Sequence, residues 1–341
     1  MSERQMTFRA LDIGDGTDGR WASHTQARWP AAEGWLSEEG RTPEGAQRAR
    51  ALFETHMPEL VPVLDRLAVQ LDRPGGDTFL TLALVRPFFS GCTQIGGNGT
   101  LLRNYDFSPE ECEGTIVSSH FLRPVIGMQD AGWGLLDGMN DAGLAVSLTF
   151  GGRFVHGPGF AVLIVLRYLL ETCATVDEAV ARLATIPVAI PQNITLVDSE
   201  QVVTVHVGPD IPLTVTPDTC AANHQHAPVP EEQERFSRTQ ERLRAVRASG
   251  ADDVEAMLRP PLYQYSYDEG LGTVYTAAYR PAEGRVTYVW PGERWEQSFE
   301  GFTPGSRTVT IGGRAVPPAD PAGASLADRP HTISSSFQSS V

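Results

Sequence analysis

The spacing of apolar residues predicts helices early in the chain. From Pro43 to Leu71, apolar side chains recur at steps of three and four residues, which is the period of an amphipathic helix. Pro74-Gly75-Gly76 ends that pattern. The stretch from Thr78 to Val85 is apolar, but it is too short to assign to helix or strand from its period. Residues 1 to about 45 show only weak periodicity.

Hairpin signals dominate from residue 92 onwards. Cys92 to Ile95 and Thr100 to Phe107 flank Gly96-Gly97-Asn98-Gly99, and Gly and Asn tolerate the positive φ that a tight turn requires. Six further strands are predicted, of which the last four form two hairpins. They are Val117–Phe121, Ala142–Phe150, Ile194–Val197, Val202–Val207, Thr273–Tyr279 and Arg285–Trp290.

Three helices are predicted among these strands. Phe160–Thr172 is apolar enough for a buried helix, and Thr175 caps a second helix, with Glu178 as the partner in a capping box. Arg235–Val246 has the pattern of a charged amphipathic helix. Because the strands are joined mainly as hairpins and the helices are grouped, the order favours an α+β fold with antiparallel sheets over alternating βαβ units.

Composition removes several functions from consideration. None of the 341 residues is lysine, so the 27 basic residues are all arginine, against 42 acidic residues and a net charge of −15. A P-loop and a Schiff-base enzyme both need a lysine. The acidic balance argues against nucleic acid and against an anionic membrane surface as partners.

The termini and the cysteines indicate a cytoplasmic protein. The N-terminus lacks an apolar signal-peptide stretch, and the most apolar run, Phe160–Leu166, ends at Arg167. The four cysteines are widely spaced with no CxxC pair, so we expect free thiols rather than a zinc site or disulfides. Residues 317–341 are rich in Pro, Ala and Ser and are predicted to be a disordered tail.

Four short motifs in one order suggest the chemistry. Ser90-Gly91-Cys92-Thr93 opens a strand, and Arg103 to Phe107 lies on the returning strand. Asp137 to Val146 and Cys220 to Gln225 follow. Together they resemble the cysteine N-terminal-nucleophile hydrolases. The peptidase C45 group, related to acyl-CoA:6-aminopenicillanic acid acyltransferase, is the most similar, alongside choloylglycine hydrolases and acid ceramidases. The resemblance extends over about residues 88–300.

This resemblance implies an autoprocessed enzyme with a four-layer αββα sandwich. The chain would be cut between Gly91 and Cys92, giving a pro-segment of residues 1–91 that stays bound and a catalytic domain of residues 92–316. The freed α-amine, with an ordinary pKa of about 7.7–8.0, would act as general base for the Cys92 thiol. An acyl-Cys92 intermediate would then hydrolyse or transfer the acyl group of a small-molecule linear amide or thioester. No cofactor is implied.

The resemblance also assigns roles to single residues. Asp106 would orient the α-amine, Arg103 would neutralise Asp106 or stabilise the thiolate, and Asn223 would donate to the oxyanion. Residues three apart on a regular strand face opposite ways, so a bulge or a strand end is needed for Arg103 and Asp106 both to reach Cys92. Further candidates for binding substrate or oxyanion are Thr149, Asn140, His224 and Arg242, the last being the best match among Arg235, Arg238 and Arg242.

Two other interpretations stay open at this point. Cys92 and His224, with Asn223 as the orienting residue, could form a papain-like dyad that needs no cut. The chain could also be a catalytically silent binding or scaffold protein. His224 and His226 would share a strand face, but no third ligand is evident, so no metal is expected. The sequence does not decide whether the chain forms a homo-oligomer.

Overall fold

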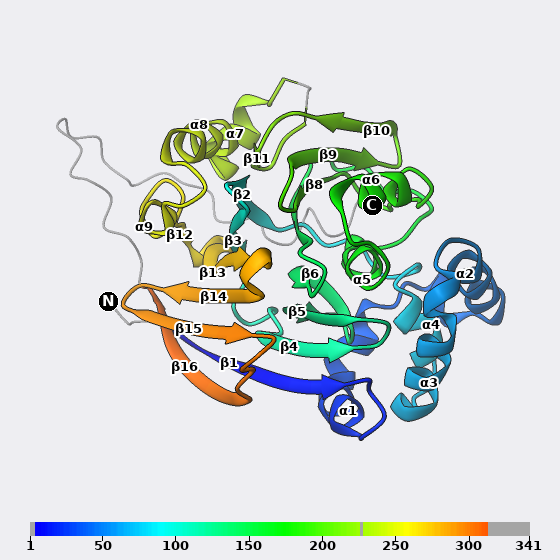
Figure 1. Ribbon diagram of the computed structural model, residues 1–341. Coiled ribbons are helices and arrows are strands. Elements are labelled where there is room, and N and C mark those ends of the chain that lie inside the picture. The colour runs from blue at the N-terminus through cyan, green and yellow to red at the C-terminus, as the bar shows by residue number, and fades with distance from the viewer. Residues whose placement is uncertain (1–3, 226–227, 313–341) are drawn as a thin grey trace.

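The computed structural model describes residues 4–225 and 228–312, which form two stacked β-sheets with helices on both outer faces (Figure 1). Within those residues the larger sheet has nine strands in the order β10-β9-β8-β7-β6-β5-β4-β1-β16. These strands are β1 (Arg4–Gly14), β4 (Thr115–His120), β5 (Pro124–Asp130), β6 (Gly134–Asn140), β7 (Ala145–Phe150), β8 (Gln192–Val197), β9 (Val202–Gly208), β10 (Ile211–Thr216) and β16 (Gly305–Gly312).

The smaller sheet packs face to face on the larger one. Its order is β11-β2-β3-β13-β14-β15, with β12 paired to β13. A Cβ added to Gly96 of β2 would lie 2.6 Å from a Val197 methyl group and 2.7 Å from one of Val202, both in the larger sheet. The strands are β2 (Gly91–Gly97), β3 (Thr100–Phe107), β11 (Cys220–Ala221), β12 (Tyr265–Ser266), β13 (Leu271–Arg280), β14 (Arg285–Trp290) and β15 (Glu293–Ser298).

Helices complete the outer layers. α5 (Val162–Thr172) and α6 (Val176–Leu183) pack on the larger sheet. α8 (Thr239–Ser249) and α9 (Val254–Met257) pack on the smaller one, after the short α7 (Glu231–Ser237). The order of layers is therefore helix, sheet, sheet, helix, which confirms the expected α+β sandwich.

The first 91 residues are part of this core. β1 lies between β4, to which it is parallel, and the antiparallel β16. The helices α1 (Arg20–Ala32), α2 (Pro43–His56), α3 (Val61–Leu71) and α4 (Gly76–Thr81) gather beside one end of the larger sheet (Figure 1). Short 3₁₀ turns accompany them and recur later, at Glu33–Trp35, Glu39–Arg41, Pro58–Leu60, Tyr267–Glu269 and Pro281–Glu283.

Local sequence signals predicted the hairpin turns and the helix caps, but they did not predict where the helices end. Asn98 and Gly99 both have positive φ, 50° and 68°, as a two-residue hairpin turn requires. Thr175 caps α6 by accepting the Glu178 N–H at 3.3 Å, although the Glu178 carboxylate accepts from Ala174 rather than from Thr175.

Two stretches with a helical pattern in the sequence are each divided into two helices in the structure. The pattern from Pro43 to Leu71 contains α2 and α3, because Pro58 follows the end of α2 and cannot continue its hydrogen bonds. The predicted helix Arg235–Val246 is divided at Arg238, whose φ of 51° is left-handed. The predicted tail 317–341 and His226 lie outside the described residues.

Candidate active site

Cys92 is buried near the start of β2, and its sulfur and its backbone have different neighbours. The Sγ atom accepts a hydrogen bond from Arg103 Nη2 at 3.2 Å and lies 3.7 Å from Ser90 Oγ. Burial raises the pKa of the Cys92 thiol, and the positive charge of Arg103 opposes that shift. The intact chain therefore keeps the sulfur protonated at neutral pH, beside a cation that favours the thiolate.

Two side chains hold the backbone of Cys92. Its N–H donates to Asn223 Oδ1 at 3.1 Å, and its carbonyl accepts from Arg242 Nη1 at 2.7 Å. The Asn223 Nδ2 group donates to the carbonyl of Phe150 at 3.2 Å and to that of Ser90 at 3.5 Å. Asn223 thus contacts the chain on both sides of the peptide bond between Gly91 and Cys92.

Asp106 lies directly opposite Gly91 in the β2–β3 pair. Its carboxylate accepts from Arg242 at 3.2 Å, from Gln264 at 2.9 Å and from Thr273 at 2.7 Å. Burial raises the pKa of Asp106, while Arg242 and these donors oppose the shift. A Cβ at position 91 would stand 2.9 Å from the Asp106 Cβ, so the close approach of the two strands requires glycine there.

Arg103 does not pair with Asp106, and this corrects one of its two expected roles. It pairs with Asp137 and donates to Tyr275 at 2.9 Å and to the Leu148 carbonyl at 3.1 Å. The β2–β3 register is continuous, so Arg103 and Asp106 face opposite sides of the sheet without a bulge. Arg103 contacts the Cys92 sulfur on one face of the sheet, whereas on the other face Asp106 is linked to the Cys92 carbonyl through Arg242, which bonds both.

Arg242 is the late arginine that enters the site. It is fully buried on α8 and bonds Asp106, the Cys92 carbonyl, Thr93 and Asn223, while its Nε donates to the Ser237 carbonyl at 2.9 Å. Arg235 is exposed, and Arg238 pairs with Glu241 at the surface. The left-handed residue Arg238 ends α7 and starts α8, which directs Arg242 inwards.

Of the other candidates, Thr149 supports the site and Asn140 lies apart from it. Thr149 Oγ1 donates to the Ala222 carbonyl at 2.7 Å and so fixes the chain just before Asn223. Asn140 Nδ2 binds the carbonyls of Leu170 and Cys173 at the end of α5, while its Oδ1 accepts from the turn that follows β6. Each of these four bonds is structural, and none involves Cys92.

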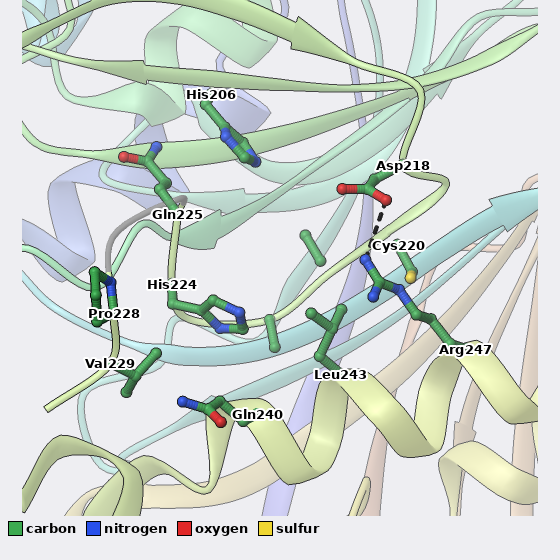
Figure 2. A pocket seen from close by; sticks show the side chains of 12 residues that line it. His206, Asp218, Cys220, His224, Gln225, Pro228, Val229, Gln240, Leu243 and Arg247 are labelled. Atoms are coloured by element: carbon green, nitrogen blue, oxygen red, sulfur yellow. Dashed lines mark hydrogen bonds and ion pairs between the residues drawn. The ribbon is translucent and has the colours of Figure 1, made fainter. Parts of the chain in front are cut away.

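The His224 ring bonds Thr239 and is not a partner of the Cys92 sulfur. Its Nδ1 lies 2.8 Å from Thr239 Oγ1, which also accepts the Asn223 N–H at 2.7 Å. Burial lowers the pKa of His224, so the ring is neutral at pH 7. The ring lines a cavity of about 320 Å³ between α8 and the β11 segment, where Arg247 pairs with Asp218 (Figure 2).

Several residues that hold the site were not found from the sequence. Asn193 Nδ2 donates to Thr149 and to the carbonyls of Ala222 and His224. Gln264, Thr273 and Asp137 bind the charged residues described above. Their types are common and their partners distant along the chain, so only the strand pairing could identify them. Among the described residues, no cluster of three or more His, Cys, Asp or Glu is placed to bind a metal, and no helix is long and apolar enough to cross a bilayer.

Comparison with known proteins adds a family to this geometry. The sequence profile of the acyl-coenzyme A:6-aminopenicillanic acid acyl-transferase family matches residues 93–295, more than half of the chain. No curated protein matches the sequence.

Three solved structures are similar at low identity. A mutant of the conjugated bile acid hydrolase of Clostridium perfringens is 13% identical over 67% of this chain and 100% of that one, with a TM-score of 0.42. Penicillin V acylase from Agrobacterium tumefaciens is 13% identical over 66% and 92%, with a TM-score of 0.39. The N-acylethanolamine-hydrolyzing acid amidase ortholog of Caenorhabditis elegans is 15% identical over 56% and 92%, with a TM-score of 0.41.

Proposed function

The chain belongs to the acyl-coenzyme A:6-aminopenicillanic acid acyl-transferase family, and on that premise we propose an autoprocessed cysteine hydrolase or acyltransferase. It cuts its own chain before Cys92 and then cleaves or transfers the acyl group of a linear amide or thioester. The observation that carries the proposal is that the two reactive atoms of Cys92, its sulfur and its backbone nitrogen, have different neighbours. The sulfur lies beside Arg103, and the backbone nitrogen lies beside Asn223, in the strand pair that Asp106 shares.

The first step is the cut. Cys92 Sγ attacks the Gly91 carbonyl carbon, the C–N bond breaks, and the thiol proton passes to the Cys92 nitrogen. Water then hydrolyses the thioester, which leaves a carboxylate on Gly91 and restores the thiol. Contacts to Ser90 and to the Cys92 N–H hold the scissile bond still during this step.

Turnover uses the amine that the cut releases. An α-amine titrates near pH 8, close to a thiol, so it takes the Cys92 proton at neutral pH. Asp106, paired with Arg242, orients the ammonium group, and Arg103 stabilises the thiolate. Asn223 Nδ2, which donates towards the Ser90 carbonyl in the intact chain, then donates to the oxyanion of the substrate. Water releases the acyl group as an acid, while an amine or thiol acceptor receives it by transfer.

The papain-like alternative has no support from the contacts of Cys92. The hydrogen-bond partners of its sulfur within the described residues are Arg103 and Ser90, and His224 is bound to Thr239 instead. A dyad would need the ring within hydrogen-bond reach of the sulfur.

Intact-mass analysis tests the proposal. We expect the wild type to separate into fragments of 91 and 341 − 91 = 250 residues, while Cys92→Ala stays whole. Cys220→Ala, which changes another buried cysteine, is the control and should cut normally. Because the sequence has no lysine, amine labelling should mark only the α-amines at Met1 and at the new N-terminus.

Acylation of Cys92 by a substrate tests the turnover step separately from the cut. An activated acyl thioester should add one acyl mass to the 250-residue fragment and none to Cys92→Ala. Active wild-type protein that remains one full-length chain would rule out autoprocessing. Acylation of Cys92→Ala to the wild-type extent would rule out the nucleophile.

A further inference from the structure

A second, smaller cavity lies between the N-terminal helices and the strands behind the site. It measures about 60 Å³ and is separate from the cavity that His224 lines. Residues 25–35 form one wall, and β3, the β5–β6 turn and a few residues of other segments, among them Phe88 and Glu113, form the rest. The side chains that matter here are Thr25, Arg28, Phe88, Tyr105, Glu113 and Asp130.

Two hydroxyl groups that line this cavity have no hydrogen-bond partner among the described residues. Thr25 Oγ1 and Tyr105 OH are buried, and neither has a hydrogen bond to any described residue. An unpaired buried hydroxyl is costly, and most native ones are satisfied by protein or water. Two of them in one cavity therefore indicate a polar occupant that supplies hydrogen bonds.

Carboxyl groups line the same space. Glu113 is bound by His24 at 2.9 Å and by Gln129 at 3.0 Å. Asp130 accepts the Ala131 N–H at 2.7 Å and has no side-chain partner among the described residues. Burial and the charge of Glu113 raise the pKa of Asp130 to about 7, against the opposing positive charge of Arg28. Burial, with a smaller contribution from the Asp130 charge, raises the pKa of Tyr105.

Tyr105 connects this cavity to the nucleophile. It lies directly opposite Cys92 in the β2–β3 pair. The Arg103 guanidinium stands over its ring, 4.7 Å from the centroid, and the same group touches Cys92 Sγ at 3.2 Å. Tyr105 therefore both pairs with Cys92 across the two strands and lines the cavity.

We propose that this cavity is the subsite for the far end of the acyl group, and that it selects a compact acyl group ending in an ammonium. An ammonium donates three hydrogen bonds, and Asp130, Tyr105 and Thr25 offer acceptors for them. The volume admits only a few non-hydrogen atoms, so a long aliphatic chain does not fit. The inference rests on the proposed acyl-Cys92 chemistry. It adds that Thr25, within residues 1–91, belongs to the substrate site.

Matched substrates test this subsite through turnover. Anilides of 4-aminobutanoate and 5-aminopentanoate are compared with those of pentanoate and hexanoate, in which a methyl replaces the ammonium. We expect kcat/KM to favour the better amino substrate at least about tenfold over its isostere, the effect of a charged hydrogen bond. Asp130→Asn and Tyr105→Phe should each bring that ratio close to one. Glu110→Gln, an exposed carboxyl nearby in sequence, should keep it.

Binding gives a second readout that needs no turnover. Butylammonium titrated into the wild type should bind at least about tenfold more tightly than into Asp130→Asn, with Glu110→Gln matching the wild type. Turnover of the alkyl anilides with no amino preference overturns the subsite and leaves the proposed function standing. Butylammonium binding that depends on Asp130, in a protein with no turnover, supports the subsite and overturns the proposed function. Binding that is equal in wild type and Asp130→Asn overturns the subsite.

Discussion

At the scale of single residues, Arg242 joins most of the polar contacts around the scissile bond. It is the cation beside the buried Asp106, and it also holds Asn223 and the Cys92 carbonyl. Arg242→Met should lower the free energy of unfolding by about 3–5 kcal/mol, because a buried carboxylate loses its partner. It should also slow the cut, because Asn223 loses its support. Denaturant titration and intact mass measure the two effects.

Arg247→Met is the matched control for that substitution. Arg247 lies on the same helix, but its pair with Asp218 is about half exposed. Surface pairs of this kind contribute about 0–1 kcal/mol, so the control should be nearly as stable as the wild type. Equal stability and an equal rate of cutting in Arg242→Met and Arg247→Met would contradict the role given to Arg242.

The sequence could predict which residues gather at the site, but not which of them form ion pairs with one another. Cys92, Asp106, Asn223 and Arg242 come together as the motifs indicated. The alternation of a strand already placed Arg103 and Asp106 on opposite faces. The partner of Arg103 is Asp137, in the other sheet, and no local pattern encodes how two sheets stack.

At the scale of elements, the left-handed residue between α7 and α8 is a local weak point. Arg238 has a φ of 51°, which costs about 1–2 kcal/mol for a residue with a side chain. Arg238→Gly should therefore leave stability unchanged or raise it by up to ~1 kcal/mol. Arg235→Gly, in the regular part of α7, should lower it by about 1 kcal/mol. Thermal unfolding compares the two, and equal losses in both would refute the account.

Short-range pairing explains which elements the sequence could predict. The turn at Asn98-Gly99 is encoded in its own residues. β1 was missed because its partners, β4 and β16, lie roughly 100 and 300 positions further on. Its burial does alternate over the first seven residues, where Phe8 and Ala10 are buried and Gln5, Thr7 and Arg9 are exposed, so a local strand signal was present and was not used.

At the scale of the whole molecule, the sandwich does not separate into two units at Gly91–Cys92. Phe8 and Trp21 are fully buried, Trp29 is nearly so, and β1 lies inside the larger sheet. Each such aromatic ring contributes about 1.5–3 kcal/mol by burial, and many apolar residues of this segment share the core.

After cutting, the 91- and 250-residue fragments should therefore remain one particle. Size-exclusion chromatography in buffer should show a single peak that contains both, and separation should need denaturant. A 250-residue fragment that elutes alone, folded and active, would contradict this prediction. That outcome would also remove Thr25 from the substrate site.

The pairing of β1 with β16 has a practical consequence for the order of the chain. Arg4 and Gly312 are partners in that pair, so the two outer ends of the described fold are neighbours in space. A short linker could join them, and the chain could begin instead at Cys92. Removal of the initiator methionine would then deliver the free α-amine without any cut. Such a circular permutant should be active as synthesised, which would separate the chemistry of maturation from that of turnover.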